Sequence, residues 1–195
     1  MIRQGMLLVL VAGAAGCLSL KPQPDPARFY VLSATVAEPE ARQPGSLVGV
    51  GPVTLPGYLR HSQILTRYDD HKMSLAESSR WAEPLEPMVA RVLRDDLAAA
   101  LGAERGLEYP WSRSFAPSPV VEVDFESFER DSAGTARLDA RWRVRNGAIM
   151  RAGRTRLTEP STSASNEDAV AALSRVLGRL AQEIATAARE LAKAE

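Results

Sequence analysis

Few residues in this chain form a pattern that could support catalysis or metal binding. The two histidines, His61 and His71, belong to no HExxH or HxH motif. Asp69 and Asp70 beside His71 leave a metal site open, although a polar loop is the favoured interpretation. No serine stands in a GxSxG motif, and no GxxxxGKS or GxxxxGKT motif offers a phosphate-binding loop. The sequence therefore predicts a protein that is not an enzyme, with no catalytic residue, cofactor or metal.

The single cysteine, Cys17, is informative because of its position. It follows a charge-free run at residues 6–15, and Arg3 lies near the start of the chain. This layout is typical of a secretory signal peptide. The run is too short for a membrane span, because about ten residues of helix cover only ~15 Å. A plain signal peptide that happens to end near a cysteine is the alternative interpretation.

The residues before Cys17, which are Ala14, Ala15 and Gly16, resemble the lipobox of bacterial lipoproteins. The resemblance implies removal of the signal peptide, residues 1–16, and attachment of acyl chains such as palmitate to Cys17. Two or three chains would anchor the protein stably in a membrane. Leu18 is not the aspartate typical of inner-membrane lipoproteins, so we expect the periplasmic face of the outer membrane of a Gram-negative cell. Residues 17–27 contain three prolines and predict an extended tether.

The remaining chain has the composition of an ordinary globular domain. The 195 residues include 24 Lys and Arg against 24 Asp and Glu, and 45% are hydrophobic. A chain of this length can bury a sufficient core without disulfides or metals, and its balanced charge gives no general attraction to nucleic acid. We therefore expect a single domain over residues 28–195.

Two short segments rich in β-branched and aromatic residues predict strands at 28–33 and 46–53. A hairpin is predicted from the runs at 64–68 and 72–75. The polar residues between these two runs favour a turn. These segments place β structure in the first half of the domain.

A stronger pattern follows in the second half of the chain. Apolar and charged residues alternate at 120–126 and again at 135–145. The charged face is acidic in the first segment and basic in the second, so antiparallel pairing would set opposite charges across from each other. The Asn-Gly dipeptide at 146–147 is a turn signal and leads into a third strand at 148–158.

Two helices are predicted from apolar residues at helical spacing. The first covers 84–101 and ends at Gly102, whereas the second begins near Ser165 or Asn166 and continues to Leu191. Together with the strands, this order predicts an α+β fold in which two main helices pack on one face of a mainly antiparallel sheet.

Two surface features leave alternatives open. The arginines between Arg137 and Arg156 would either bind lipid phosphates or nucleic acid, or form cross-strand ion pairs on a solvated face. The acidic neighbouring strand favours the ion pairs. The apolar stripe of the last helix would either pack within the domain, which its short length favours, or form a coiled coil with a second copy.

Three parts of the chain resemble one known family. They are FYVL at residues 29–32, the segments VGVGPV, LPGYL and QILTR within residues 48–67, and RWAEPL at residues 80–85. On these residues the chain is similar to the PqiC/YmbA family of ABC-type transport auxiliary lipoproteins. The YPW segment at 109–111 and the alanine-rich last helix follow in the order that the family has.

The resemblance implies an auxiliary subunit that is anchored in the outer membrane and docks with an MCE-domain protein. Such a subunit serves an ABC system that moves lipids between the inner and outer membranes. The resemblance also implies an α+β domain and a homo-oligomer in the form of a ring. The candidate partner-contacting residues are Leu55, Pro56, Tyr58, Leu59, Arg80 and Trp81. Two other functions stay open: a lipid-binding carrier module and, less favoured, a lipoprotein hydrolase of the envelope.

Overall fold

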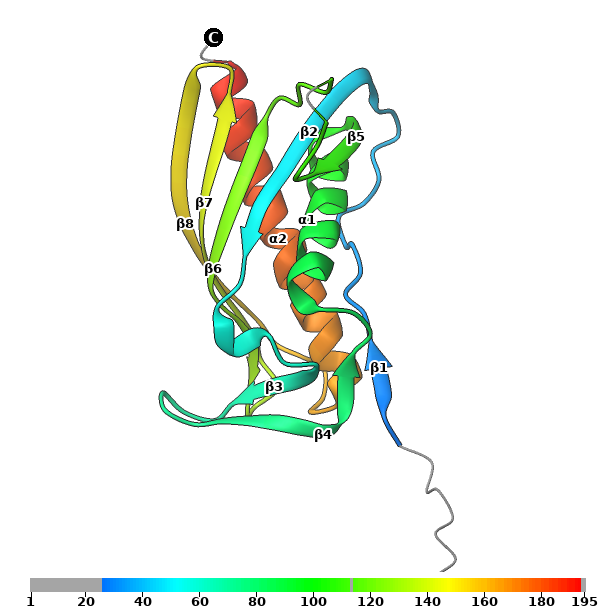
Figure 1. Cartoon of the computed structure of the whole chain (residues 1–195), viewed down its shortest axis with the longest axis vertical. Coiled ribbons are helices and arrows are strands. Elements are labelled where there is room, and N and C mark those ends of the chain that lie inside the picture. Colours follow the sequence, from blue (N-terminus) through cyan, green and yellow to red (C-terminus); the bar gives the residue numbers. More distant parts are fainter. Residues whose placement is uncertain (1–25, 113, 194–195) are drawn as a thin grey trace, which may run out of the picture.

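Two α-helices and eight strands make up the part of the chain that the computed structural model describes, residues 26–112 and 114–193 (Figure 1). The strands are β1 (Arg28–Tyr30), β2 (Gln43–Thr54), β3 (Gln63–Arg67), β4 (Met73–Trp81), β5 (Ala103–Glu108), β6 (Val120–Asp131), β7 (Ala136–Asn146) and β8 (Ile149–Glu159). The helices are α1 (Leu85–Leu101), α2 (Asn166–Ala192) and the short 3-10 helix η1 (Gly57–Leu59). None of the helices in these ranges is long and apolar enough to cross a membrane. The predicted signal peptide and Cys17 lie outside the described residues.

The predicted three-stranded meander is confirmed. Strands β6 and β7 pair antiparallel with Val123 opposite Trp142, and β7 pairs with β8 in the same sense. The expected charge pairing follows from this register. Glu122 forms an ion pair with Arg143 at 2.6 Å, and Glu126 forms one with Arg141 at 2.6 Å. The outer face of the meander is therefore a cross-strand network of opposite charges, as the alternating pattern predicts.

The prediction of a mainly antiparallel sheet is only partly right. The hairpin of β3 and β4 is antiparallel as expected, but four of the seven strand pairs in the described sheet are parallel. Two strands pair with the same edge of β6, both in parallel orientation. The first half of β6 pairs with β2, and the end of β6 pairs with β3. Strand β5, which the sequence does not predict, extends the sheet beside β2. Parallel neighbours need long crossover connections, and α1 supplies the one between β2 and β5.

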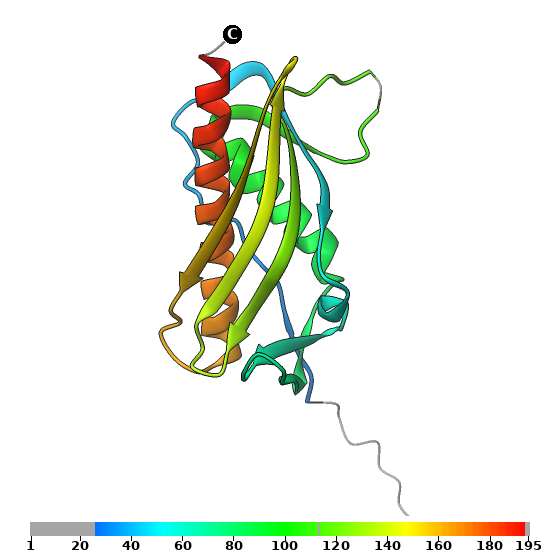
Figure 2. The same cartoon turned by 90° about the vertical axis from the view of Figure 1, so that its left-hand side faces the viewer.

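Both helices lie on one face of the sheet, as predicted, with α1 over β2 and β5 and α2 over β7 and β8 (Figure 2). The α1 helix ends at Gly102, which adopts φ 68° and closes the last turn in a left-handed conformation. The α2 helix begins after Ser165, whose side chain accepts a hydrogen bond from the Asp168 amide at 3.1 Å. The apolar stripe of α2 is buried within the domain, so intramolecular packing accounts for it.

The chain that follows β1 crosses the helices on the side away from the sheet, and we call residues 31–36 the strap. Leu32 is buried, and its amide lies 3.1 Å from Sδ of Met88 in α1. The Thr35 and Val36 amides donate to Oδ1 of the buried Asp96 at 2.7 and 2.8 Å. Among the described residues, no strand pairs with the strap at these amides, and the helix side chains accept their hydrogen bonds instead. The strap is therefore held in one position on the helices.

One contact between β7 and β8 depends on a glycine. The indole of Trp142 covers Gly153 in the neighbouring strand, and its Nε1 donates to Oγ1 of Thr155 at 2.9 Å. A methyl group at Gly153 would lie 2.3 Å from Cζ2 of the indole. The glycine therefore provides the space that the buried tryptophan occupies.

We expect Gly153→Ala to lower the free energy of unfolding by about 1–3 kcal/mol, because the tryptophan must leave its packed position. Gly57→Ala is the matched control, since nothing lies within 4 Å of a methyl group placed there. Urea unfolding of both variants measures the difference. Equal stability of the two variants would show that the Trp142 contact tolerates the added atom.

Candidate functional site

The two segments singled out by their sequence come together in one pocket. Residues 55–62 lie after β2, and residues 81–87 connect β4 to the start of α1. Together they line a pocket of about 500 Å³, which we call the η1 pocket. The Trp81 amide donates to the Ser62 carbonyl at 2.7 Å, which holds the two segments against each other.

The floor of the η1 pocket is apolar and its rim is polar. Leu55, Leu59, Trp81 and Leu85 are buried and form part of the domain core. Around them lie residues that are polar, exposed or both, which are Arg60, His61, Ser62, Ala82, Glu83, Pro84, Glu86 and Pro87. A small number of polar groups around an apolar base is the usual composition of a binding pocket.

The pocket is fixed to α1 by a carboxylate of the helix's first turn. Glu86 accepts a hydrogen bond from the Leu55 amide through Oε2 at 3.0 Å. Pro84 occupies the N-cap position, where its missing N–H costs nothing because the first amides of a helix have no intrahelical partner. The helix start therefore sets the position of the segment that leads into η1.

A buried ion pair supports η1 from the other side. Glu129 of β6 has a side chain only 1% exposed, and its Oε1 accepts from Nε of Arg67 at 2.6 Å. Its Oε2 accepts from the Tyr58 hydroxyl at 2.9 Å and from the Phe128 amide at 2.9 Å. Burial, followed by the charge of Glu129, raises the pKa of the Tyr58 hydroxyl, so it stays protonated as a donor. The hydrogen bond to Glu129 likewise raises the pKa of the Arg67 guanidinium.

The six candidate contact residues do not form an exposed surface in the structure. Leu55, Leu59 and Trp81 are buried and shape the pocket floor. The other three, Pro56, Tyr58 and Arg80, are half-buried around η1 and at the end of β4. The exposed rim residues are not among these six candidates, because their types are ordinary for a loop and only their position beside the buried leucines distinguishes them.

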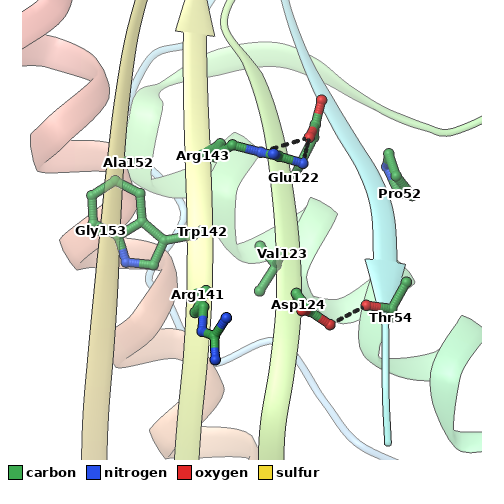
Figure 3. Close-up of a pocket in the computed structure, with 10 residues that line it drawn as sticks. All are labelled: Pro52, Thr54, Glu122, Val123, Asp124, Arg141, Trp142, Arg143, Ala152 and Gly153. Atoms are coloured by element: carbon green, nitrogen blue, oxygen red, sulfur yellow. Dashed lines mark hydrogen bonds and ion pairs between the residues drawn. The ribbon is translucent and has the colours of Figure 1, made fainter.

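A second hollow lies on the outer face of the sheet, across β2, β6, β7 and β8 (Figure 3). Its volume is about 480 Å³, and Arg141 and Arg143 extend into it from β7. The carboxylate of Glu122 faces Arg143, and Oδ1 of Asp124 accepts from the Thr54 hydroxyl at 2.5 Å. Because these charges already pair with one another, this hollow is a weaker candidate for binding an anionic ligand.

The same face contains a carboxylate with a markedly lowered pKa. Hydrogen bonds from Arg154 and Arg156 lower the pKa of Asp139 from 3.8 to about 2. A carboxyl whose pKa is lower in the folded state stabilises the fold above pH ~4, and this contribution disappears as the pH falls toward ~2. The two guanidiniums are largely exposed, so solvent screening limits the gain to about 1 kcal/mol.

We therefore expect Asp139→Asn to lower the free energy of unfolding by about 1 kcal/mol at pH 7 and to have little effect near pH 2. Urea titrations of the two proteins across this pH range measure the difference. A constant difference at every pH would mean that the charge of Asp139 is not its cause.

The residues with catalytic or metal-binding potential remain apart. Among the described residues, no group of three or more His, Cys, Asp or Glu side chains is placed to hold a metal. The His71 backbone amide donates to Asp69 at 2.8 Å, which is the polar turn of the β3–β4 hairpin. His61 lies on the rim of the η1 pocket.

Comparison with protein families finds a match that covers most of the chain. The model of the ABC-type transport auxiliary lipoprotein component family matches residues 30–185. The comparison with curated proteins finds no match. The matched range includes the strap, the η1 pocket and most of α2.

Solved structures share the fold. A crystal structure of an uncharacterized protein superposes with a TM-score of 0.68 at 17% identity, covering 85% of this chain and 98% of the other. Protein XCC0632 from Xanthomonas campestris, assigned to family model DUF330, gives a TM-score of 0.63 at 16% identity, with 82% and 93% covered. At these identities the likeness establishes the architecture of the domain and nothing about its ligands.

Proposed function

The chain belongs to the family of ABC-type transport auxiliary lipoprotein components, and from this premise we propose that it is a docking subunit of an MCE-type lipid-transport system. In this proposal Cys17 carries the acyl chains and anchors the protein on the periplasmic face of the outer membrane. The folded domain binds an MCE-domain protein through the η1 pocket. The system moves lipids between the inner and outer membranes, and any ATPase is a separate subunit.

The η1 pocket is the observation that carries the docking proposal. Two separate segments that resemble the family form its floor and part of its rim. A hydrophobic base surrounded by charged and exposed residues is the arrangement at which protein interfaces concentrate their binding energy. The support from Glu86 and Glu129 fixes the pocket before a partner arrives, which lowers the ordering cost of binding.

A matched pair of substitutions tests the pocket. Ala82 is exposed on its rim, and Ala152 is exposed beside the hollow on the outer face of the sheet. We expect Ala82→Arg to obstruct the pocket and to reduce recovery of the MCE-domain protein from crosslinked envelopes by roughly tenfold or more, as expected when an interface centre is disrupted. Ala152→Arg adds the same side chain elsewhere and should leave recovery unchanged.

Two results would contradict the docking proposal. If repeated capture with the unaltered chain recovers no MCE-domain protein, such a protein is not the partner. Loss of capture with Ala152→Arg, together with normal capture by Ala82→Arg, would move the docking surface to the sheet. The homo-oligomeric ring that the resemblance implies is tested separately, by the mass of the protein in solution from light scattering.

A further inference from the structure

Exposed apolar side chains gather where the folded domain begins. Phe29 is 64% exposed and Val31 is 52% exposed. They alternate with residues that face inward: the Tyr30 hydroxyl donates to Glu167 at 3.2 Å, and Leu32 is buried on the helices. Because side chains of an extended chain alternate between faces, Phe29 and Val31 point to the same outward side. We call the surface that they form the β1 face.

The β1 face continues onto α2. A groove of about 590 Å³ lies between the extended chain and the first turns of this helix, where Val170 and Ala171 add to its apolar lining. Arg28 and Arg175 lie at the groove, and each forms an ion pair with a glutamate. Long basic side chains beside an apolar surface suit the boundary between lipid tails and phosphates.

The same end of the molecule exposes further apolar residues. Strand β1 and the β3–β4 hairpin lie together at the end opposite the C-terminus (Figure 1). The hairpin exposes Tyr68 and Leu75, and the Lys72 ammonium lies 5.7 Å from the centre of the Tyr68 ring. A tyrosine with a neighbouring lysine is a combination that favours the membrane interface.

The length of the chain before β1 limits how far this end can lie from the anchor. Residues 17–28 span at most about 40 Å when fully extended. The strap holds the direction of β1 through the bonds to Met88 and Asp96. An anchor at Cys17 would therefore keep the start of β1 within about 40 Å of the bilayer.

We propose that the β1 face rests on the lipid bilayer that holds the anchor, with Phe29 and Val31 in the interfacial region of the bilayer. This inference depends on the acyl anchor of the proposed function. Contact of the domain itself adds apolar burial to that of the acyl chains and orients the domain on the membrane. The η1 pocket and the far end of the sheet then keep a defined direction relative to the membrane.

Site-specific labelling tests the contact, because the chain has a single cysteine and that cysteine is acylated under the proposal. A cysteine introduced by Phe29→Cys would be the one free thiol of the acylated full-length protein. It is labelled with an environment-sensitive fluorophore, and the protein is reconstituted into vesicles of phosphatidylethanolamine and phosphatidylglycerol. Met150→Cys is the matched control, since Met150 is 61% exposed and lies at the start of β8, at the other end of the domain.

We expect the label at position 29 to shift its emission to shorter wavelength on vesicles and to be quenched by spin-labelled lipid, whereas the label at position 150 keeps its emission. Val31→Cys should behave like Phe29→Cys. Vesicle-bound protein whose label at 29 stays as exposed as the label at 150 would overturn this proposal and leave the anchor intact. Protein that incorporates no palmitate and does not float with vesicles would overturn both.

A second copy of the chain is the competing occupant of the β1 face. With the anchor removed by Cys17→Ala and no vesicles present, the label at 29 should not change with protein concentration. Shielding that increases with concentration would assign the face to self-association and overturn the membrane contact.

Discussion

Glu129→Ala is expected to lower the free energy of unfolding by about 3 kcal/mol, at the lower end of the range for breaking a buried ion pair. The substitution leaves the Arg67 guanidinium and the Tyr58 hydroxyl without the carboxylate that they share. Arg67 is partly exposed, so water recovers some of its lost interactions. Because Tyr58 belongs to η1, the change should also loosen the η1 pocket. Urea unfolding measures the stability.

Glu126→Ala is the control for this prediction. Glu126 lies on the same strand and also pairs with an arginine, but its side chain is 39% exposed and that of Arg141 is 60% exposed. An exposed pair contributes less than ~1 kcal/mol, so this variant should remain close to the unaltered protein. Glu129→Gln should be intermediate, because it retains an acceptor for Tyr58 without the charge. Similar losses for Glu129→Ala and Glu126→Ala would mean that burial of the pair does not determine its contribution.

Cys17→Ala is expected to abolish acylation and to move the protein from the membrane fraction to the soluble fraction. Under the proposed function the acyl chains supply the stable anchor, whereas the β1 face alone would bury only a few side chains. Labelling with radioactive palmitate, followed by fractionation of the envelope, measures both effects.

An exposed substitution such as Met150→Ala is the control for handling and expression, and it should stay acylated and membrane-bound. Palmitate labelling that persists in the Cys17→Ala variant would disprove attachment at this residue. Membrane retention without labelling would show instead that protein contacts, including the β1 face, suffice to hold the domain.

Local patterns predicted much of the secondary structure correctly. The alternation in β6 and β7 reports which side chains face the core, and it identified both strands and their antiparallel pairing through complementary charge. The Asn-Gly turn and the polar hairpin turn could also be predicted, because each depends on the types of a few adjacent residues. The apolar spacing in α2 is a property of the helix itself, so its long extent could be predicted without knowledge of its neighbours.

Long-range pairing could not be predicted in this way. The contact of β6 with both β2 and β3 joins segments that are far apart in the chain, and no residue of either strand specifies a parallel neighbour. Strand β5 lacks a clear alternating pattern. It pairs with β2 because α1, which precedes it, brings the chain back to the edge of the sheet beside β2. The pattern of one strand determines which face is buried but not which strand lies beside it.

The candidate site shows the same division. The sequence selected the segments around Leu55 and Trp81 by resemblance, but it could not show that these two side chains are buried. Their burial depends on packing of the two segments against each other and against the domain core. Only after these elements pack do Ala82 and its neighbours become the exposed rim of a pocket.

By itself, the sequence determined the family, the expected lipid-attachment residue and the periodic elements, because each of these depends on adjacent or regularly spaced residues. The tertiary structure decided the mixed sheet, the η1 pocket and the exposure of Phe29 and Val31 at the start of the folded domain. These features depend on which distant surfaces exclude water from one another. Packing between elements, which no local pattern encodes, decides which apolar residues form the core and which stay exposed.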